Sequence, residues 1–161
     1  MEKAIVSVVM GSKSDLSDVK ETFKVLEEFG IAYEAKIMSA HRTPDEAIAY
    51  AKNAYDKGIK VIIAAAGGAA HLAGVLAGCS TIPVIGIPMK SANLNGFDSL
   101  LSVVQMPAGV PVATVAIGSA GCKNAAVLAA TMIGAFDEEM HGKIVQYKED
   151  MRKKVLESTI D

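Results

Sequence analysis

The chain has 161 residues, a formal net charge of −2, and 51% hydrophobic but only 5% aromatic residues. This length predicts one domain, residues 1–161, that buries a core without disulfides or metals, and the interspersed charges exclude the basic face on which nucleic-acid binding depends. The sequence has no signal-peptide pattern, no apolar run of membrane-spanning length and no paired cysteine spacing. We therefore expect a soluble cytoplasmic protein without membrane or nucleic-acid partners.

Five short apolar segments alternate with helical patterns along the chain. Most are rich in β-branched residues and bounded by glycine, proline or serine, as strands buried on both faces should be. The predicted strands are residues 3–10, 32–38, 61–66, 83–89 and 112–118. Their alternation with short helical crossovers predicts an α/β fold, a three-layer doubly wound parallel five-stranded sheet in flavodoxin-like order. A C-terminal helix is expected at about residues 137–157.

Helix boundaries are marked at two places. After the first strand, apolar residues recur at steps of three and four, which predicts a helix that Ser14 and Asp15 can cap and Gly30 can end. After the second strand, Thr43 and Glu46 have the spacing of a capping box.

The loops beyond the carboxyl ends of the strands are where a sheet of this type binds ligands. In the first of them, Ser12, Ser14 and the following helix N-terminus can cradle a phosphate through backbone N–H groups, although an ordinary helix cap explains them equally well. Asp15 could instead accept hydrogen bonds from sugar hydroxyls.

The segment SAHRTP (39–44) follows the second predicted strand and contains one of only three histidines. An isolated histidine is usually structural, but the position of His41 at a strand end beside Arg42 favours a functional role, since imidazole exchanges protons near neutral pH. Arg42 is the best candidate for binding a phosphate or carboxylate with two hydrogen bonds. Its alternative role is a solvated surface charge.

The segment GGAAHL (67–72) has almost no side chain before His71. Such a loop lets a ligand approach the main chain closely, but it also suits a tight helix entry. The sequence shows no pair of catalytic carboxylates, no Ser-His-Asp signature and no metal-ligand spacing. This scarcity of reactive groups favours a chemistry in which one residue lends a proton and takes it back.

Together, the motifs GSKSD, SAHRTP, GGAAHL, PVIGIP, DSLLSVVQMPAGVPVATVAIG and NAAVLAA, spread from residue 11 to 130, resemble those of class I N5-carboxyaminoimidazole ribonucleotide mutase. The related class II enzymes carboxylate aminoimidazole ribonucleotide directly with carbon dioxide; they typically carry a lysine after the histidine and lack GGAAHL, so Arg42 and His71 favour class I. Ala65 and Ala73 depart from the family pattern beside the glycine turn.

The resemblance implies an isomerase of purine biosynthesis that moves a carboxyl group from an exocyclic nitrogen to a ring carbon, without metal or cofactor, on a small ribonucleotide substrate. It implies that His41 is the acid and base. The implied substrate-binding residues are Ser12, Ser14 and Arg42 for the phosphate, Asp15 for the ribose, Ser39 and Ala40 beside them, and Gly67, Gly68, Ala69, Ala70 and His71 around the migrating carboxyl group.

The segment 124–136 is apolar on nearly every helical face, which predicts burial all round. A neighbouring subunit is the expected cover, and the resembled family forms octamers; the alternative is cover by the chain's own C-terminal helix. A rival function is a flavodoxin-like binding module that holds flavin or acts as a phosphorylated receiver. It is weakened by the scarcity of aromatic and clustered acidic residues in the strand-end loops.

Overall fold

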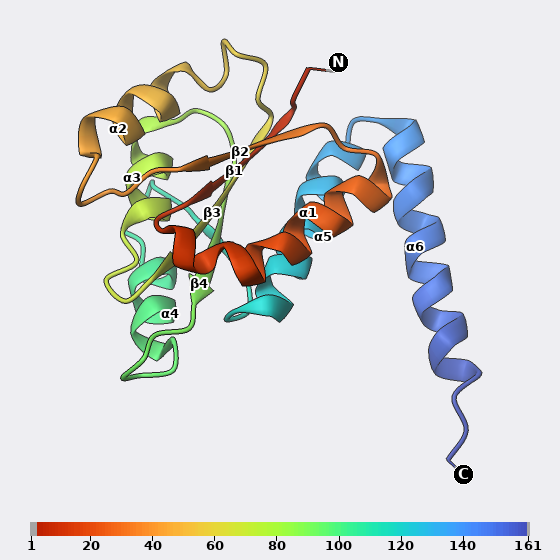
Figure 1. Cartoon of the computed structure of the whole chain (residues 1–161). Coiled ribbons are helices and arrows are strands. Elements are labelled where there is room, and N and C mark those ends of the chain that lie inside the picture. Colours follow the sequence, from red (N-terminus) through yellow and green to blue (C-terminus); the bar gives the residue numbers. More distant parts are fainter. Residues whose placement is uncertain (1–2, 161) are drawn as a thin grey trace.

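A parallel five-stranded sheet forms the centre of the structure, a computed structural model that describes residues 3–160. The strands are β1 (Val6–Met10), β2 (Tyr33–Ile37), β3 (Val61–Gly67), β4 (Val84–Met89) and β5 (Ala113–Thr114). They lie in the order β2-β1-β3-β4-β5, with every neighbouring pair parallel (Figure 1). This arrangement confirms the predicted doubly wound, flavodoxin-like fold.

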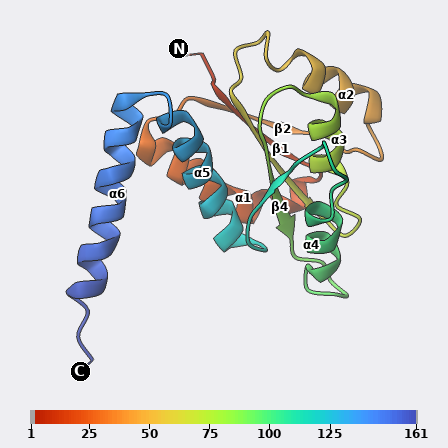
Figure 2. The same cartoon turned by 180° about the vertical axis from the view of Figure 1, so that it is seen from behind.

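Helices cover both faces of the sheet. They are α1 (Leu16–Phe29), α2 (Pro44–Asn53), α3 (Leu72–Cys79), α4 (Phe97–Val104), α5 (Ser119–Gly134) and α6 (Glu138–Leu156), with a short 3₁₀ turn, η1 (Lys13–Asp15), before α1. The helices α1 and α5 pack together on one face, and α2, α3 and α4 lie on the other (Figure 2).

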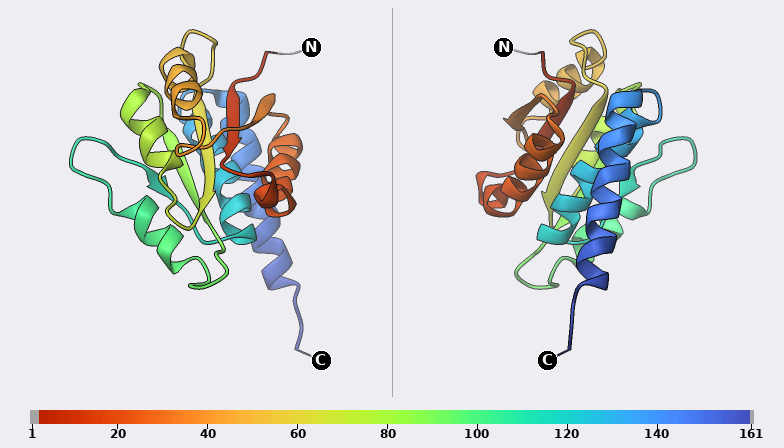
Figure 3. Two further views of the ribbon diagram at one scale, coloured as in Figure 1. Left: turned by 60° about the vertical axis from the view of Figure 1, so that its left-hand side comes forward. Right: turned by 90° about the vertical axis from the view of Figure 1, so that its right-hand side faces the viewer.

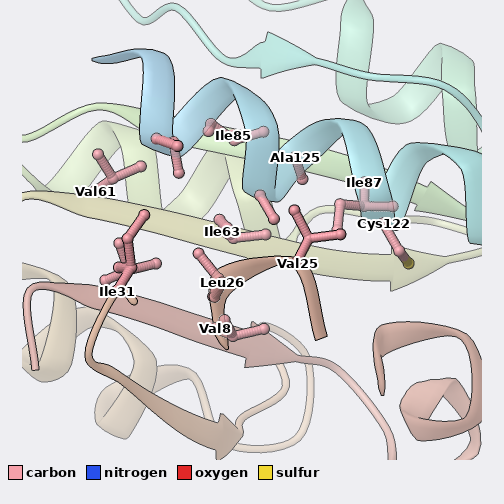
Figure 4. Packing of buried hydrophobic residues seen from close by; sticks show 14 of the residues in the cluster. Val8, Val25, Leu26, Ile31, Val61, Ile63, Ile85, Ile87, Cys122 and Ala125 are labelled. Carbon is pink, nitrogen blue, oxygen red and sulfur yellow. The ribbon is translucent and has the colours of Figure 1, made fainter. Parts of the chain in front are cut away.

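The core has two halves because side chains alternate between the faces of a strand. Val8 and Ile63 point toward α1 and α5, where Leu26 and Ala125 pack over them (Figure 4). Val9 points to the opposite half, beneath α2 and α3. The central strands are thus apolar on both sides, which explains their nearly continuous hydrophobic sequences.

The edge strands depart from the prediction of burial on both faces. β2 is only partly covered, and Ile37 on it is 56% exposed, because an edge strand of the sheet has a neighbour on one side only.

The central strand β1 is shorter than predicted, because it begins at Val6 rather than at residue 3.

The predicted strand 112–118 is wrong in length, since β5 has only two residues. The chain continues beside β4, where the N–H groups of Val115 and Gly118 donate to the carbonyl oxygens of Gly86 and Pro88 at 3.1 and 2.9 Å. The ladder ends there because the first turn of α5 packs directly on this segment: a β-carbon on Gly121 would lie 1.7 Å from the carbonyl oxygen of Ala116.

The end of α1 follows the prediction and its start does not. Gly30 caps its C-terminus in the left-handed region, at φ 70°. Asp15 stands at the N-cap position without a side-chain capping bond, and Ser14 does not cap α1. The intervening turn η1 is the reason, because there the Ser12 side chain accepts the hydrogen bond from the backbone N–H of Ser14.

The last two helices meet the prediction in part. α5 begins at Ser119, before the predicted residue 124, and the sheet, α1 and α6 cover it on one side, so it is not buried all round. α6 buries Met140 and Ile144, but its second half extends past the body of the molecule (Figure 3), where Val155 is 74% exposed. Within residues 3–160, no helix combines the length and apolarity needed to span a membrane.

The contact between Gly121 and Ala116 predicts that Gly121→Ala lowers the free energy of unfolding by about 3 kcal/mol, because the added methyl group has no space. The matched control is Gly142→Ala in α6, where a β-carbon meets nothing within 4 Å. There the same change should raise the free energy of unfolding by about 0.5–1 kcal/mol through helix propensity. Urea denaturation of both variants measures this, and shifts of the same sign would contradict the packing described.

Candidate active site

A cavity of about 440 Å³ opens at the carboxyl edge of the sheet, where the chain leaves β1, β2, β3 and β4. This volume is within the range of small-molecule sites. The cavity is lined by Gly11, Ser12, Ser14, Asp15, Ser39, Ala40, His41, Arg42, Ala66, Gly67, Gly68, Ala69, His71, Leu72, Lys90 and Ser91. All of the predicted site residues except Ala70 therefore lie around one space.

Ala70 lies behind the lining, 1% exposed. Lys90 and Ser91 also line the cavity and were not predicted from the sequence. Both belong to the loop after the predicted fourth strand, so strand-end position was the signal that could have found them.

The Ser39 hydroxyl organises the turn that carries the histidine. Its oxygen accepts hydrogen bonds from the backbone N–H groups of His41 and Arg42 at 3.3 and 3.2 Å. The predicted capping box is wrong, because the Thr43 hydroxyl accepts from the Ser39 N–H at 2.9 Å instead of capping α2. These local bonds fix the backbone of the turn and direct His41 and Arg42 into the cavity.

Hydroxyl and guanidinium groups gather at the end of the cavity next to β2. The Ser14 hydroxyl donates to the Ser12 hydroxyl at 2.9 Å. The Arg42 guanidinium donates to the Gly11 carbonyl oxygen at 2.8 Å, which joins the loops after β1 and β2. Its remaining N–H groups and the Ser12 hydroxyl form a group of donors suited to a phosphate, which the Ser14 hydroxyl can join by rotating away from Ser12.

Asp15 lies partly buried at the same end of the cavity. Loss of hydration raises the pKa of its carboxyl group, and hydrogen bonding to the Ser12 backbone opposes the shift less strongly. The carboxyl group lines the cavity, so its oxygens can also accept hydrogen bonds from a polar ligand.

The glycine turn after β3 is held from below by a buried serine. The Ser99 hydroxyl accepts from the Gly68 N–H at 2.8 Å and donates to the Met89 carbonyl oxygen at 2.7 Å. Gly68 has φ +67°, a conformation that side chains rarely adopt. The result is a wall of exposed main chain beside the two histidines, and Ser99 is a supporting residue that the sequence did not reveal.

The two histidines of the cavity contact each other across separate loops. His41 Nε2 lies 2.8 Å from His71 Nδ1, and the rings meet edge to face at 76°. One nitrogen must donate and the other accept, so each ring sets the tautomer of the other. With this bond intact the pair can hold one additional proton but not two, since two imidazolium rings would point N–H groups at each other.

In the described part of the chain, no three histidine, cysteine, aspartate or glutamate side chains converge in a way that could hold a metal ion.

Fold and cavity together define a class: a flavodoxin-like α/β protein that combines a group of hydrogen-bond donors with a histidine pair at the carboxyl edge of its sheet. The chain belongs to the AIR carboxylase family, whose model matches residues 5–154.

The relatives agree with this assignment over nearly the whole chain. The proteins named N5-carboxyaminoimidazole ribonucleotide mutase in Pyrococcus horikoshii and Thermotoga maritima are 56% and 57% identical to it, over 97% and 94% of this chain and 87% and 88% of theirs. The crystal structure of Treponema denticola PurE is 31% identical and superimposes with a TM-score of 0.85 over 94% of both chains. The predicted family is confirmed.

The raised pKa of Asp15 predicts a pH-dependent effect of Asp15→Asn on stability. A folded-state pKa above the unfolded value of about 3.9 contributes stability below that pH, and the contribution is lost as pH rises through the folded pKa. Asparagine imitates the protonated carboxyl at every pH. The variant should therefore melt about 1–3 °C above the wild type at pH 7 and level with it at pH 3.5, as measured by calorimetry. A variant that gains stability only toward low pH would contradict the direction of the shift.

Proposed function

We propose that this chain is an N5-carboxyaminoimidazole ribonucleotide mutase of de novo purine biosynthesis, an isomerase that moves the carboxyl group from the exocyclic nitrogen to a ring carbon of its substrate. The observation that carries the proposal is the contact between His41 and His71 beside the glycine turn, in one cavity with Arg42. The mutase relatives provide the second support.

In this proposal the nucleotide lies along the carboxyl edge of the sheet. Its phosphate accepts hydrogen bonds at the end next to β2, from Ser12, Ser14 and Arg42, beside Ser39 and Ala40. The Asp15 carboxylate accepts hydrogen bonds from the ribose hydroxyls. This leaves the aminoimidazole ring facing His41.

The reaction then needs one proton and no external reagent. The bond between the exocyclic nitrogen and the carboxyl carbon breaks, its electron pair stays on nitrogen, and nitrogen takes a proton from His41 while carbon dioxide is released into the cavity. The electron-rich ring carbon attacks carbon dioxide and forms the new carbon–carbon bond. His41 then removes the proton from that carbon, which restores the aromatic ring and the initial protonation state.

His71 fits this scheme as the residue that positions the imidazole of His41. Because the histidine pair can hold only one additional proton, it is suited to a cycle that lends one and collects one. The hydrogen bond also fixes the orientation of the His41 ring, which contributes to the rate by holding the reacting groups in place.

The glycine turn would retain carbon dioxide between the two steps. Gly67, Gly68, Ala69 and Ala70 place main chain and methyl groups around the proposed position of the carboxyl group. A neutral gas is held by shape rather than by charge, so a closely fitting wall with small side chains prevents its escape to water.

The test is an assay of the purified protein with two substrates. We expect conversion of N5-carboxyaminoimidazole ribonucleotide to 4-carboxy-5-aminoimidazole ribonucleotide at a rate at least 100-fold above that with aminoimidazole ribonucleotide and bicarbonate. Equal or faster conversion of the second pair would assign the direct carboxylation of the class II enzymes instead. Absence of both activities, with bound flavin, would assign the binding module.

The variant His41→Asn tests the assignment of the acid and base. It should lower turnover by at least about 10³-fold, since proton transfer is lost, and leave the dissociation constant of the product within about threefold of the wild type. Near-normal turnover would exclude His41 as the acid and base.

We further propose that residues 1–161 act as one cytoplasmic mutase domain that assembles into an octamer. Several large apolar side chains of the described chain lie exposed around α5 and α6; they include Phe136, Val145, Val155, Leu156 and Ile160. Phe136 also lines an apolar cavity of about 550 Å³ with Val61, Pro83 and Met132. A monomer rarely exposes so much apolar surface, and contacts between copies would cover it. The cysteines Cys79 and Cys122 are free, which suits a reducing compartment.

Assembly predicts a solution mass about eight times that of the 16.8 kDa chain, which light scattering during gel filtration at micromolar concentration measures. Phe136→Asp should reduce the mass, because it places a charge in the proposed interface. A monomeric wild type would contradict the proposal and leave the assay above unaffected.

A further inference from the structure

Lys90 is the cation of the cavity that has no partner. It directly follows β4 and lines the cavity, and among residues 3–160 it makes no hydrogen bond or ion pair. The nearest acidic residue along this loop is already engaged, since Asp98 accepts a hydrogen bond from Ser91 at 2.6 Å.

The side chain of Lys90 is exposed and runs past Gly118. A β-carbon added to Gly118 would lie 3.5 Å from Cε and 3.6 Å from Cγ of Lys90, in ordinary van der Waals contact. The backbone of Lys90 adjoins the glycine turn: a β-carbon on Gly67 would lie 3.7 Å from the Lys90 carbonyl oxygen. A lysine that lines a cavity beside the glycine turn, with an unpaired ammonium group, is placed to meet an anion.

The charges of the proposed substrate and of the lining residues can be compared. The proposed substrate carries about three negative charges, up to two on the phosphate and one on the carboxyl group. Among the lining residues, Arg42 and Lys90 carry permanent positive charge, and Asp15 opposes them. Arg42 follows β2 and Lys90 follows β4, with the loops of β1 and β3 between them. The two cations are therefore separated along the sheet edge, so each can bind a different anionic group of the substrate.

We propose that the Lys90 ammonium group binds the carboxylate of the substrate and of the product at the end of the cavity next to β4, and thereby determines specificity for carboxylated nucleotides. The inference rests on the proposed function, which places the phosphate at the opposite end. Carbon dioxide itself is neutral, so Lys90 stabilises the two carboxylated forms and gives no assistance to the step between them.

The experiment compares Lys90→Met, which removes the charge and keeps the stem, with Lys90→Arg, which keeps the charge. We expect Lys90→Met to raise KM for the carboxylated substrate at least tenfold without lowering kcat, because the lost contact is made in the bound ground state, and Lys90→Arg to restore KM to within threefold. The inhibition constant of aminoimidazole ribonucleotide, which has the phosphate but no carboxylate, should stay within twofold in both variants.

Lys20→Met is the matched control, since it removes the same charge from an exposed position on α1. It should leave KM within twofold, and thermal unfolding of every variant establishes that it is folded. Equal weakening of the carboxylated and uncarboxylated nucleotides by Lys90→Met would overturn the proposal in favour of a phosphate contact, and an unchanged KM would overturn it altogether. Wild-type turnover, measured separately, decides the proposed function.

Discussion

The parallel pairing of β1 with both β2 and β3 is the constraint on which the cavity depends. Met10 at the end of β1 pairs with Ile37 at the end of β2 and with Ala65 of β3, so β1 and β2 end at the same level and β3 runs two residues further, to Gly67. The pairing continues one step further, where Met38 donates to the Met10 carbonyl oxygen and Gly11 to that of Ala65, both at 3.0 Å. The loops after β1, β2 and β3 therefore start from one edge of the sheet. Arg42 joins the first two through its bond to Gly11, and His41 joins the second and third through its contact with His71.

The site is built mainly from main chain and small side chains, so serine hydroxyls within and beneath it hold its loops in place. Ser39 fixes the histidine turn and Ser99 fixes the glycine turn. Each hydroxyl accepts hydrogen bonds from backbone N–H groups that the loop would otherwise leave unpaired. These bonds stabilise the conformation of the loop. Asp15 is the exception, because its partial burial costs stability in the free protein and gains a hydrogen-bond acceptor inside the cavity.

The sequence predicted the central architecture because buried parallel strands are apolar on both faces and leave a continuous pattern. It failed where tertiary contacts decide: β5 is shortened by the close approach of Gly121 to Ala116, and Thr43 bonds to Ser39 instead of capping α2. Strand-end position was sufficient to select His41, but the contact between His41 and His71 joins residues 30 apart and has no local signature. Lys90 was missed because an isolated lysine in a polar loop reads as a surface charge.

The sheet order keeps the two cations of the cavity apart. Arg42 follows β2 and Lys90 follows β4, with β1 and β3 between them, so the two side chains enter the cavity from different strands of its edge. In the proposed function this separation lets Arg42 bind the phosphate and Lys90 the carboxylate, since two cations at one place would repel each other. His41 and His71 contact each other in the same cavity, so charge binding and the proposed proton exchange fall to different side chains.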